Sequence, residues 1–335
     1  MQNELPPKFM VAKTLPADFS MEETAESLWR LHMEMATDFQ RVQDDVDAGR
    51  IELGDMPSPE KSYLELKTEI ARRIISHCHL CSRMCGVNRL EGKLGWCRCG
   101  VDITVSSIFE HLGEEPELVP SGTIFTMGCT MRCKHCQNWG ISQWIESGHI
   151  FSSLELAAEI EHLRMSGCRN ANLVGGEPTP WLRNWLDVFG NVQVNVPVVW
   201  NSNSYYSPET ASLLRGFVDV YLLDFKYGPG ECAERISGAP GYWNACVRNH
   251  LDAAKHGELI VRVLVLPDHL ECCTRPILEW IAKNLGAETR VNLMFQYRPE
   301  WRAREVPELC RSLSEEEKKQ AVRIAGDAGL RNFIT

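Results

Sequence analysis

The chain has 335 residues, a formal net charge of −10 and 44% apolar residues. This length can bury a large core, and one α/β domain with extensions would account for it. The acidic balance argues against a broad nucleic-acid-binding surface, so nucleic acid is not expected as a partner. No apolar run approaches the roughly 20 residues of a membrane span, so no membrane partner is expected.

The chain contains 14 cysteines, which in a secreted protein would suggest disulfides. Residues 1–13, however, lack the apolar stretch and the cleavage pattern of a secretory signal. We therefore expect a cytoplasmic protein in a reducing environment. Grouped cysteines bind metals or react there.

Residues 1–60 are predicted to form a helical N-terminal extension that ends in a linker. Ser20 followed by Glu23 indicates a capping box at a helix start. Apolar residues then recur at helical spacing, which predicts a packing helix; they are Leu28, Leu31, Met35, Phe39 and Val42. Glycines and prolines over residues 47–62 indicate the linker. A second helix is predicted over residues 62–76.

A cysteine-rich group follows that helix, within a predicted segment over residues 61–120. Its four cysteines have the spacing C-x2-C-x3-C-x11-C, with Cys99 in addition; they are Cys78, Cys81, Cys85 and Cys97. Thiols grouped so closely in sequence indicate a metal site. Zinc and a second iron–sulfur cluster both suit four thiolates, and the spacing does not separate them.

A second cysteine group, C-x3-C-x2-C, follows the apolar run at residues 123–127. It comprises Cys129, Cys133 and Cys136. Zinc usually takes a closed tetrahedral set, and no fourth cysteine follows at close spacing. Three thiolates suit a 4Fe-4S cluster with one iron left open for a small molecule. We therefore predict a catalytic cluster at this loop.

From residue 121 to residue 335 the pattern alternates between strands and helices. Strands are predicted near residues 124–127, 172–174, 196–200, 218–223, 259–266 and 290–294. Helices are predicted near residues 153–166, 181–189, 207–216, 245–255, 275–284 and 314–328. Six strand–helix units predict an α/β fold with a partial (β/α)6 TIM-type barrel.

Polar residues fall where these strands end, which is where barrels of this kind bind ligands. Gly175, Gly176 and Glu177 end the second strand, where glycines permit close approach and the carboxylate can pair with an ammonium. Asn201, Ser202 and Asn203 end the third strand and either bind ribose hydroxyls or cap the next helix. Asp224 and Lys226 end the fourth strand on the same side, and a plain ion pair is the alternative.

Arg262 lies within an apolar strand, where a guanidinium needs an anionic partner. Either a ligand carboxylate or a structural Asp or Glu would serve. His269 and Gln296 are weaker candidates near the ends of later strands. The remaining cysteines show no metal spacing beyond one adjacent pair and are expected to be incidental; they are Cys168, Cys232, Cys246, Cys272, Cys273 and Cys310.

The three-cysteine loop resembles the signature of the radical S-adenosylmethionine (SAM) superfamily. In that family the thiolates carry a 4Fe-4S cluster, and SAM chelates the open iron through its amine and carboxylate. One electron then splits SAM into methionine and a 5′-deoxyadenosyl radical, which takes a hydrogen atom from a substrate. The residue before the third cysteine is often aromatic, and here it is His135. Residues 175–177 resemble the family's Gly-Gly-Glu motif, which meets the methionyl amine.

The likeness extends over most of the chain, to the PflX-like group of proteins that resemble pyruvate formate-lyase activating enzymes. It is carried by Cys-Gly-Val-Asn-Arg at residues 85–89, Ser-Ile-Phe-Glu-His-Leu-Gly-Glu-Glu-Pro at 107–116 and Cys-Gln-Asn-Trp at 136–139. Asp224-Phe225-Lys226 resembles the Asp-x-Lys of activating enzymes, whose lysine meets the SAM carboxylate.

The resemblance implies a radical SAM enzyme with a protein or peptide substrate and a flavodoxin, ferredoxin or reductase as electron donor. A maturase or a small-molecule isomerase remains open within that chemistry. The alternative from another class is a non-enzymatic iron–sulfur or zinc protein that carries electrons or binds a partner. The polar residues at the strand ends favour the enzyme, because a carrier has no use for them.

Overall fold

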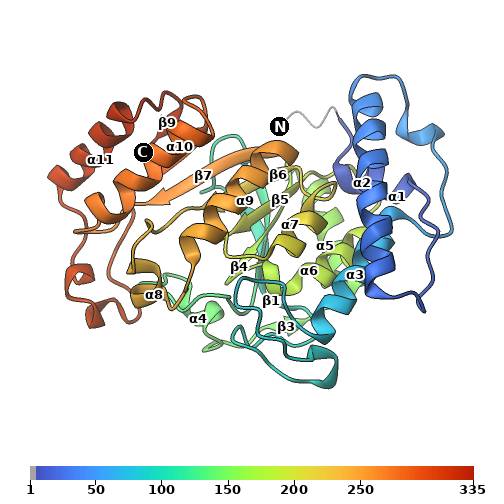
Figure 1. The fold of residues 1–335 in the computed structure, drawn as a ribbon, viewed down its shortest axis with the longest axis horizontal. Helices are drawn as coiled ribbons and strands as arrows, with labels where there is room; N and C mark the ends of the chain where they lie inside the picture. The colour runs from blue at the N-terminus through green and yellow to red at the C-terminus, as the bar shows by residue number, and fades with distance from the viewer. Residues whose placement is uncertain (1–4) are drawn as a thin grey trace.

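The computed structural model describes residues 5–335, which form one nine-stranded open sheet flanked by helices (Figure 1). The sheet order is β3-β1-β2-β4-β5-β6-β7-β8-β9. The strands are β1 (Thr104–His111), β2 (Ser121–Thr126), β3 (His149–Ile150), β4 (Ala171–Gly175), β5 (Val198–Ser202), β6 (Val220–Asp224), β7 (Glu258–Leu264), β8 (Arg290–Met294) and β9 (Phe333–Ile334).

The six predicted strands β2, β4, β5, β6, β7 and β8 are present and pair in parallel. The predicted α/β class with a mostly parallel sheet is therefore confirmed, and the sheet stays open. Strands β1, β3 and β9 were not predicted. β1 pairs antiparallel with β2 and carries polar residues on its more exposed half, so it lacks the continuous apolar run of the buried strands.

The later helices return the chain between parallel strands, and five α-helices of the described residues 5–335 begin at a side-chain cap. The α-helices are α1 (Lys8–Thr14), α2 (Ala25–Asp47), α3 (Tyr63–Ser76), α4 (Trp139–Ser142), α5 (Ser153–Met165), α6 (Leu182–Asn191), α7 (Pro208–Leu214), α8 (Cys232–Ser237), α9 (Tyr242–His256), α10 (Arg275–Asn284) and α11 (Glu315–Asp327). Capping boxes start α3, α5 and α11, where a serine and a glutamate three residues on satisfy each other's backbone N–H groups.

The predicted start of the first long helix was wrong. Ser20 and Glu23 form a turn in which the Ser20 N–H donates to the Glu23 carboxylate at 2.9 Å. The helix α2 begins later, with Thr24 as its N-cap accepting from the Ser27 N–H at 3.2 Å. Thr24 is the N-cap because threonine in extended backbone can accept a hydrogen bond from the first turn with its side-chain hydroxyl. The predicted apolar face is confirmed, since Leu28 is fully buried.

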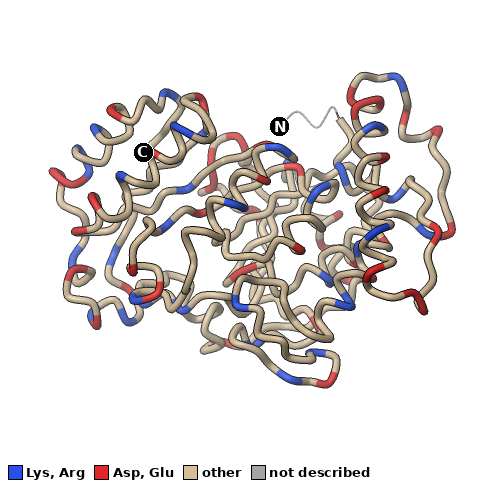
Figure 2. Tube along the Cα trace, in the orientation of Figure 1, with Lys and Arg blue, Asp and Glu red and all other residues tan. Residues whose placement is uncertain are grey.

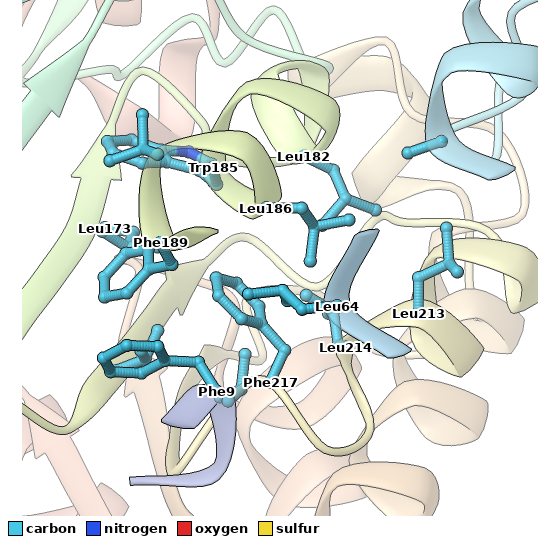
Figure 3. Close-up of a cluster of buried hydrophobic side chains, with 14 of the residues drawn as sticks. Phe9, Leu64, Leu173, Leu182, Trp185, Leu186, Phe189, Leu213, Leu214 and Phe217 are labelled. Carbon is cyan, nitrogen blue, oxygen red and sulfur yellow. The ribbon is translucent and has the colours of Figure 1, made fainter. Parts of the chain in front are cut away.

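The N-terminal helices α1, α2 and α3 lie together at one end of the sheet, on the side of α6 (Figure 1). Their apolar side chains join the core of the barrel (Figure 3). Phe9 of α1 meets Phe189 of α6 with ring centroids 4.9 Å apart, and Leu64 of α3 packs in the same cluster. The extension thus shares one core with the strands that carry the site.

The loop between β1 and β2, residues 112–120, fills the end of the sheet where the parallel strands begin. We call it the β1–β2 loop. Leu118 is buried in a small cluster with side chains of β5, β6 and β7: Val199, Val220, Leu222 and Ile260. At the far edge the Glu117 carboxylate pairs with Arg290 at 2.6 Å. The opposite end of the strands therefore holds the accessible part of the interior.

Acidic and basic residues are interspersed along the whole trace (Figure 2). Within residues 5–335, no helix has both the length and the apolar composition to cross a membrane.

Candidate functional site

A cavity of about 410 Å³ opens at the carboxyl ends of the parallel strands. It collects the main residues predicted for cluster and ligand binding outside the front cysteine group, whereas the weaker candidate His269 does not line it. The main residues are Cys129, Cys133, Cys136, Gly175, Gly176, Glu177, Asn201, Asp224, Lys226 and Arg262. His111, Glu114, His135, Asn203, Gln296 and Tyr297 also line it. Residues from seven strands and from the loops that follow them thus face one space.

The three-cysteine loop, residues 128–138, leaves β2 through Gly128, whose φ of +82° only glycine adopts readily. Cys129 and Cys133 are buried and Cys136 is partly exposed. Burial raises the pKa of all three thiols, that of Cys133 to about 11. The three sulfurs do not form a set within 4.8 Å, a statement that covers residues 5–335. A single tetrahedral ion with metal–sulfur bonds of about 2.3 Å would need sulfurs about 3.8 Å apart.

His135 directly precedes the third cysteine, a position at which the family signature often has a Phe, Tyr or Trp. Its ring is 4% exposed and lies edge-on to Tyr297, with centroids 5.8 Å apart. Its Nε2 hydrogen-bonds the Tyr227 hydroxyl at 2.7 Å. Burial lowers the pKa of His135 to about 3, so the ring is neutral at physiological pH. A neutral packed imidazole fills the place of an aromatic side chain.

Glu177 is buried beneath the end of β4, and its carboxylate is held by groups of this chain. It accepts from the Thr179 hydroxyl at 2.5 Å, the Ser202 hydroxyl at 2.7 Å and the Asn203 N–H at 2.8 Å. Burial raises the pKa of Glu177, and these hydrogen bonds oppose that shift. The carboxylate therefore ties the end of β4 to the end of β5.

Gly175 and Gly176 bring the end of β4 against the three-cysteine loop. A Cβ on Gly175, which has a φ of +130°, would lie 2.2 Å from the Thr126 nitrogen. A Cβ on Gly176 would lie 1.9 Å from the Gly128 carbonyl oxygen. Only glycine permits this approach. The close contact is with the chain's own backbone, so the predicted approach to a ligand stays a prediction.

Asp224 and Lys226 form an ion pair at the end of β6, and both side chains are partly exposed to the cavity. Burial lowers the pKa of Lys226, but the paired Asp224 carboxylate opposes this, and the net shift is upward. Lys226 is therefore a stable ammonium next to the three-cysteine loop. The pair does not lie on the outer surface of the protein, as the plain alternative assumed.

Arg262 already has anionic partners within the chain. Its Nε donates to Glu115 at 2.7 Å, and its Nη2 pairs with both Glu114 and Glu115. Its Nη1 lies 3.4 Å from the Asn201 Oδ1. Burial lowers the pKa of Arg262, but the hydrogen bond to Glu115 and the charges of both carboxylates raise this pKa by more. The guanidinium therefore stays charged. The structural alternative that the sequence left open is the one present here.

Asn201 does not cap α7, because Ser207 does so by accepting from the Thr210 N–H at 3.2 Å. Asn203, which the sequence placed no higher than its neighbours, has a definite position. Its amide donates to the Cys129 sulfur at 3.5 Å and to the Thr130 hydroxyl at 3.1 Å. Asn203 therefore orients the first cysteine. An Asn-Ser-Asn run at a strand end is the signal that could have singled it out.

Glu114 and Glu115 of the β1–β2 loop were also missed as interior residues. Glu115 accepts from the Asn292 amide at 2.8 Å, and Glu114 accepts from the Asn172 amide at 3.1 Å. Adjacent glutamates after an exposed strand look like a solvated turn. Only the unexplained Arg262 within an apolar strand pointed to buried acids elsewhere.

The front cysteine group packs directly against the three-cysteine loop. Arg83 donates to the Thr130 carbonyl at 2.6 Å, and its guanidinium lies 3.8 Å from the centroid of the Trp96 ring. A Cβ on Gly128 would lie 2.4 Å from the Cys99 sulfur. Contact with the Cys78 thiol lowers the pKa of Cys85 to about 5, and the Cys99 thiol lowers that of Cys97 to about 6. Two thiols of the group are thus poised as thiolates.

Two cysteines that we expected to be incidental lie together with His269, a weaker candidate, on the other side of the three-cysteine loop. The ligand atoms of Cys232, His269 and Cys272 all fall within 4.8 Å of one another. The sequence shows no spacing signal because Cys232 begins α8, whereas His269 and Cys272 lie about 40 positions later. His269 directly precedes the π-helical turn before α10, residues 270–274, and Cys272 lies within it.

Comparisons with known proteins show what this chain is similar to. The family model described as "Radical SAM superfamily" matches residues 123–281. The uncharacterized protein MJ0674 of Methanocaldococcus jannaschii is 42% identical over 326 residues, which cover 96% of this chain and 93% of the relative. MJ0808 of the same organism is 23% identical over 286 residues, which cover 75% and 81%.

Solved structures give more distant likenesses. Streptococcus suis SuiB bound to precursor peptide SuiA matches with 12% identity and a TM-score of 0.44, over 61% of this chain and 46% of that chain. This chain thus spans about half the length of SuiB. Methylornithine synthase (PylB) matches with 13% identity and a TM-score of 0.43, over 82% of this chain and 77% of that chain.

Proposed function

Because this chain belongs to the radical SAM superfamily, we propose that it binds a 4Fe-4S cluster and SAM in the cavity and abstracts hydrogen from a substrate. The observation that carries the proposal is the convergence on one cavity of the three cysteines, the two glycines and the Asp224–Lys226 pair. A carrier of electrons has no need of a space of about 410 Å³ beside its thiolates.

The residues present fit both groups. Three thiols at the rim of a cavity, spaced more widely than a single ion requires, suit a cubane that presents a different iron to each sulfur. When bound, the reduced cluster supplies one electron to the sulfonium of SAM. The thiols must lose their protons to bind iron. The bond to iron stabilises the thiolate and so overcomes the burial that otherwise raises the pKa of each thiol.

The chain's own groups give SAM an orientation. We assign the SAM carboxylate to Lys226, whose ammonium stays charged in the cavity. The SAM amine is assigned to the backbone carbonyls at Gly175 and Gly176, because the Glu177 carboxylate is already saturated by donors of this chain. Asp224 keeps Lys226 in place, and Asn201 is assigned to the ribose hydroxyls.

Arg262 acts on SAM indirectly in this proposal. With two carboxylates on its guanidinium it has little capacity for a third, so it positions Asn201 and the β1–β2 loop. This role replaces the direct contact with SAM that the sequence suggested as one of two options.

The substrate is proposed to be a protein or peptide, and the electron donor a flavodoxin or ferredoxin, since the front and rim motifs are similar to those of activating enzymes. The front cysteine group is proposed to hold a second metal centre, zinc or iron–sulfur. Its packing against the three-cysteine loop, through Arg83 and Cys99, suits either a brace or an electron relay.

The test is anaerobic incubation of iron-loaded protein with SAM and a strong reductant, followed by chromatographic measurement of 5′-deoxyadenosine. We expect release from the wild type and from the control Cys310→Ala, and none from Cys133→Ala. Cys310 is exposed and does not line the cavity, so it matches the change in residue type. A fully loaded wild type that releases no 5′-deoxyadenosine would favour an electron carrier.

The metal of the front group is tested by removing the other cluster. A Cys129/Cys133/Cys136 triple alanine variant should retain the front centre. Residual iron and sulfide in that variant would assign a second iron–sulfur cluster. Zinc without iron would assign a structural brace only if the variant holds more zinc than the group of Cys232, His269 and Cys272 can bind.

A further inference from the structure

A group of thiols and an imidazole lies where α8 meets the π-helical turn before α10. Its ligand atoms belong to Cys232, His269 and Cys272, which are partly exposed, buried and exposed, respectively. The Cys232 and Cys272 sulfurs are 3.8 Å apart. Cys273 is 2% exposed, and its sulfur is 3.8 Å from that of Cys272. Within residues 5–335, Cys232, His269 and Cys272 are the group whose ligand atoms meet the spacing of a single ion.

The Cys273 sulfur lies outside the set of ligand atoms that are all within 4.8 Å of one another. We propose that Cys232, His269 and Cys272 bind one zinc ion, toward which the neighbouring Cys273 turns as the fourth ligand, and that the ion fastens α8 beneath the three-cysteine loop. Metal–sulfur bonds of about 2.3 Å in a tetrahedron place sulfurs about 3.8 Å apart, which is the spacing observed. Three cysteines and one histidine are a standard ligand set of closed structural zinc sites. Binding releases the thiol protons to solvent and involves no change of oxidation state.

The histidine is already prepared as a ligand. His269 Nδ1 lies 2.6 Å from the Pro267 carbonyl oxygen and donates its proton to it. The Nε2 atom therefore carries the lone pair, and it points toward the thiols. A metal-binding imidazole typically has its other nitrogen fixed in this way by a backbone carbonyl or a carboxylate.

The charges around the group also suit a thiolate-rich ion. Three thiolates and one zinc carry a net charge of −1, and Arg235 lies beside them with its Nη2 3.5 Å from the His269 Nε2. Glu308 holds Arg235 from the outside at 2.5 Å. The guanidinium offsets the excess negative charge without competing as a ligand, because it has no lone pair to offer.

The position of the group explains what such an ion would do. The backbone of α8 accepts hydrogen bonds from the three-cysteine loop, from the Arg132 N–H to Ser237 at 2.9 Å and from the Lys134 N–H to Ile236 at 3.0 Å. α8 has six residues and is too short to be stable alone. A link from Cys232 to Cys272 would join its first residue to the turn after β7.

A redox-active thiol pair is the competing explanation. The sulfur separation of 3.8 Å exceeds the about 2.05 Å of a disulfide, and all three cysteines are free in the structure. A buried histidine with its Nε2 turned to the thiols has no function in a disulfide, whereas it completes a metal site. The zinc site is therefore the better account of all four side chains.

The experiment measures zinc and iron by mass spectrometry in the full chain, purified anaerobically with a reductant. We expect Cys232→Ser/Cys272→Ser to hold one zinc per chain fewer than the wild type, with unchanged iron. Cys310→Ser, an exposed cysteine outside the group, should match the wild type. Because the readout is zinc content, failure of this proposal leaves the proposed catalysis untouched, and the reverse also holds.

A second variant guards against simple misfolding of the double mutant. Cys272→His keeps a ligand at the site, so it should retain the zinc. After Co²⁺ substitution its thiolate-to-metal charge-transfer band should be weaker than that of the wild type. Equal zinc in the wild type and the double variant, an unchanged cobalt spectrum in Cys272→His, or a Cys232–Cys272 disulfide found by peptide mapping would each overturn the assignment.

Discussion

Replacing Arg262 by methionine is expected to destabilise the metal-free protein by about 3 kcal/mol, because it leaves two buried carboxylates without their cation. The Glu115 side chain is 0% exposed and that of Glu114 is 4% exposed. Removing one partner of a buried ion pair costs about 3–5 kcal/mol. The lower value applies because amides of Asn292 and Asn172 still donate to the two acids.

Urea unfolding followed by the fluorescence of the buried tryptophans measures this change. The free energy of unfolding of Arg262→Lys should lie between those of Arg262→Met and the wild type. Lysine keeps the positive charge but lacks the two-pronged guanidinium. Arg331→Met is the matched control. It removes an arginine from an exposed pair with Glu288, whose side chains are 70% and 69% exposed, so it should cost no more than about 1 kcal/mol.

The difference in free energy of unfolding between the wild type and Arg262→Met should become smaller as the pH falls from neutral to mildly acidic. In the wild type, burial raises the pKa of Glu115 but the Arg262 guanidinium lowers it more, so the pair stabilises the fold above the unfolded pKa. Without Arg262, burial alone remains and lifts that pKa above the unfolded value. The variant is then penalised at neutral pH and regains stability as Glu115 takes up a proton. A variant that unfolds at the wild-type urea concentration but needs more SAM would refute this reasoning and make Arg262 a direct ligand.

Three further changes test other parts of the site. Gly176→Ala places a Cβ 1.9 Å from a carbonyl oxygen of the three-cysteine loop, so we expect folded protein with reduced iron loading, measured as iron per chain. Tyr227→Phe leaves the buried His135 Nε2 unpaired and should cost about 1–3 kcal/mol in urea unfolding. The control Tyr221→Phe should be nearly neutral, because among the described residues its hydroxyl has no partner. Glu177→Gln weakens three hydrogen bonds to a carboxylate, so we expect about 2 kcal/mol lower stability and a raised KM for SAM in the 5′-deoxyadenosine assay.

The alternating core was predictable because its signals are local. Each parallel strand is a short apolar run, and the following helices bury apolar side chains. Some of these helices also begin at a cap, as α5 shows with Ser152 and Glu155. The bounds of β8 match the prediction, and those of α10 do as well. Strand β1 was missed because half of its residues face solvent and its apolar residues do not form a continuous run.

The cavity lining was predictable for the same reason, since parallel strands end at one edge and their last residues must meet there. Partners that come from elsewhere in the chain were not predictable. The acids that pair with Arg262 are separated from it by 147 and 148 positions. Cys232 and His269 come together only because α8 turns back beneath the end of β7, which no spacing rule reports.

The β1–β2 loop decides how much of the chain can be cut away. A truncated chain that began at Ser121 would keep every parallel strand, yet it would lose Glu115 and Leu118. Arg262 would then stand uncompensated in the interior, and the small cluster around Leu222 would face water. The shortest fragment able to fold alone therefore starts no later than β1, upstream of the first residue that the family model matches.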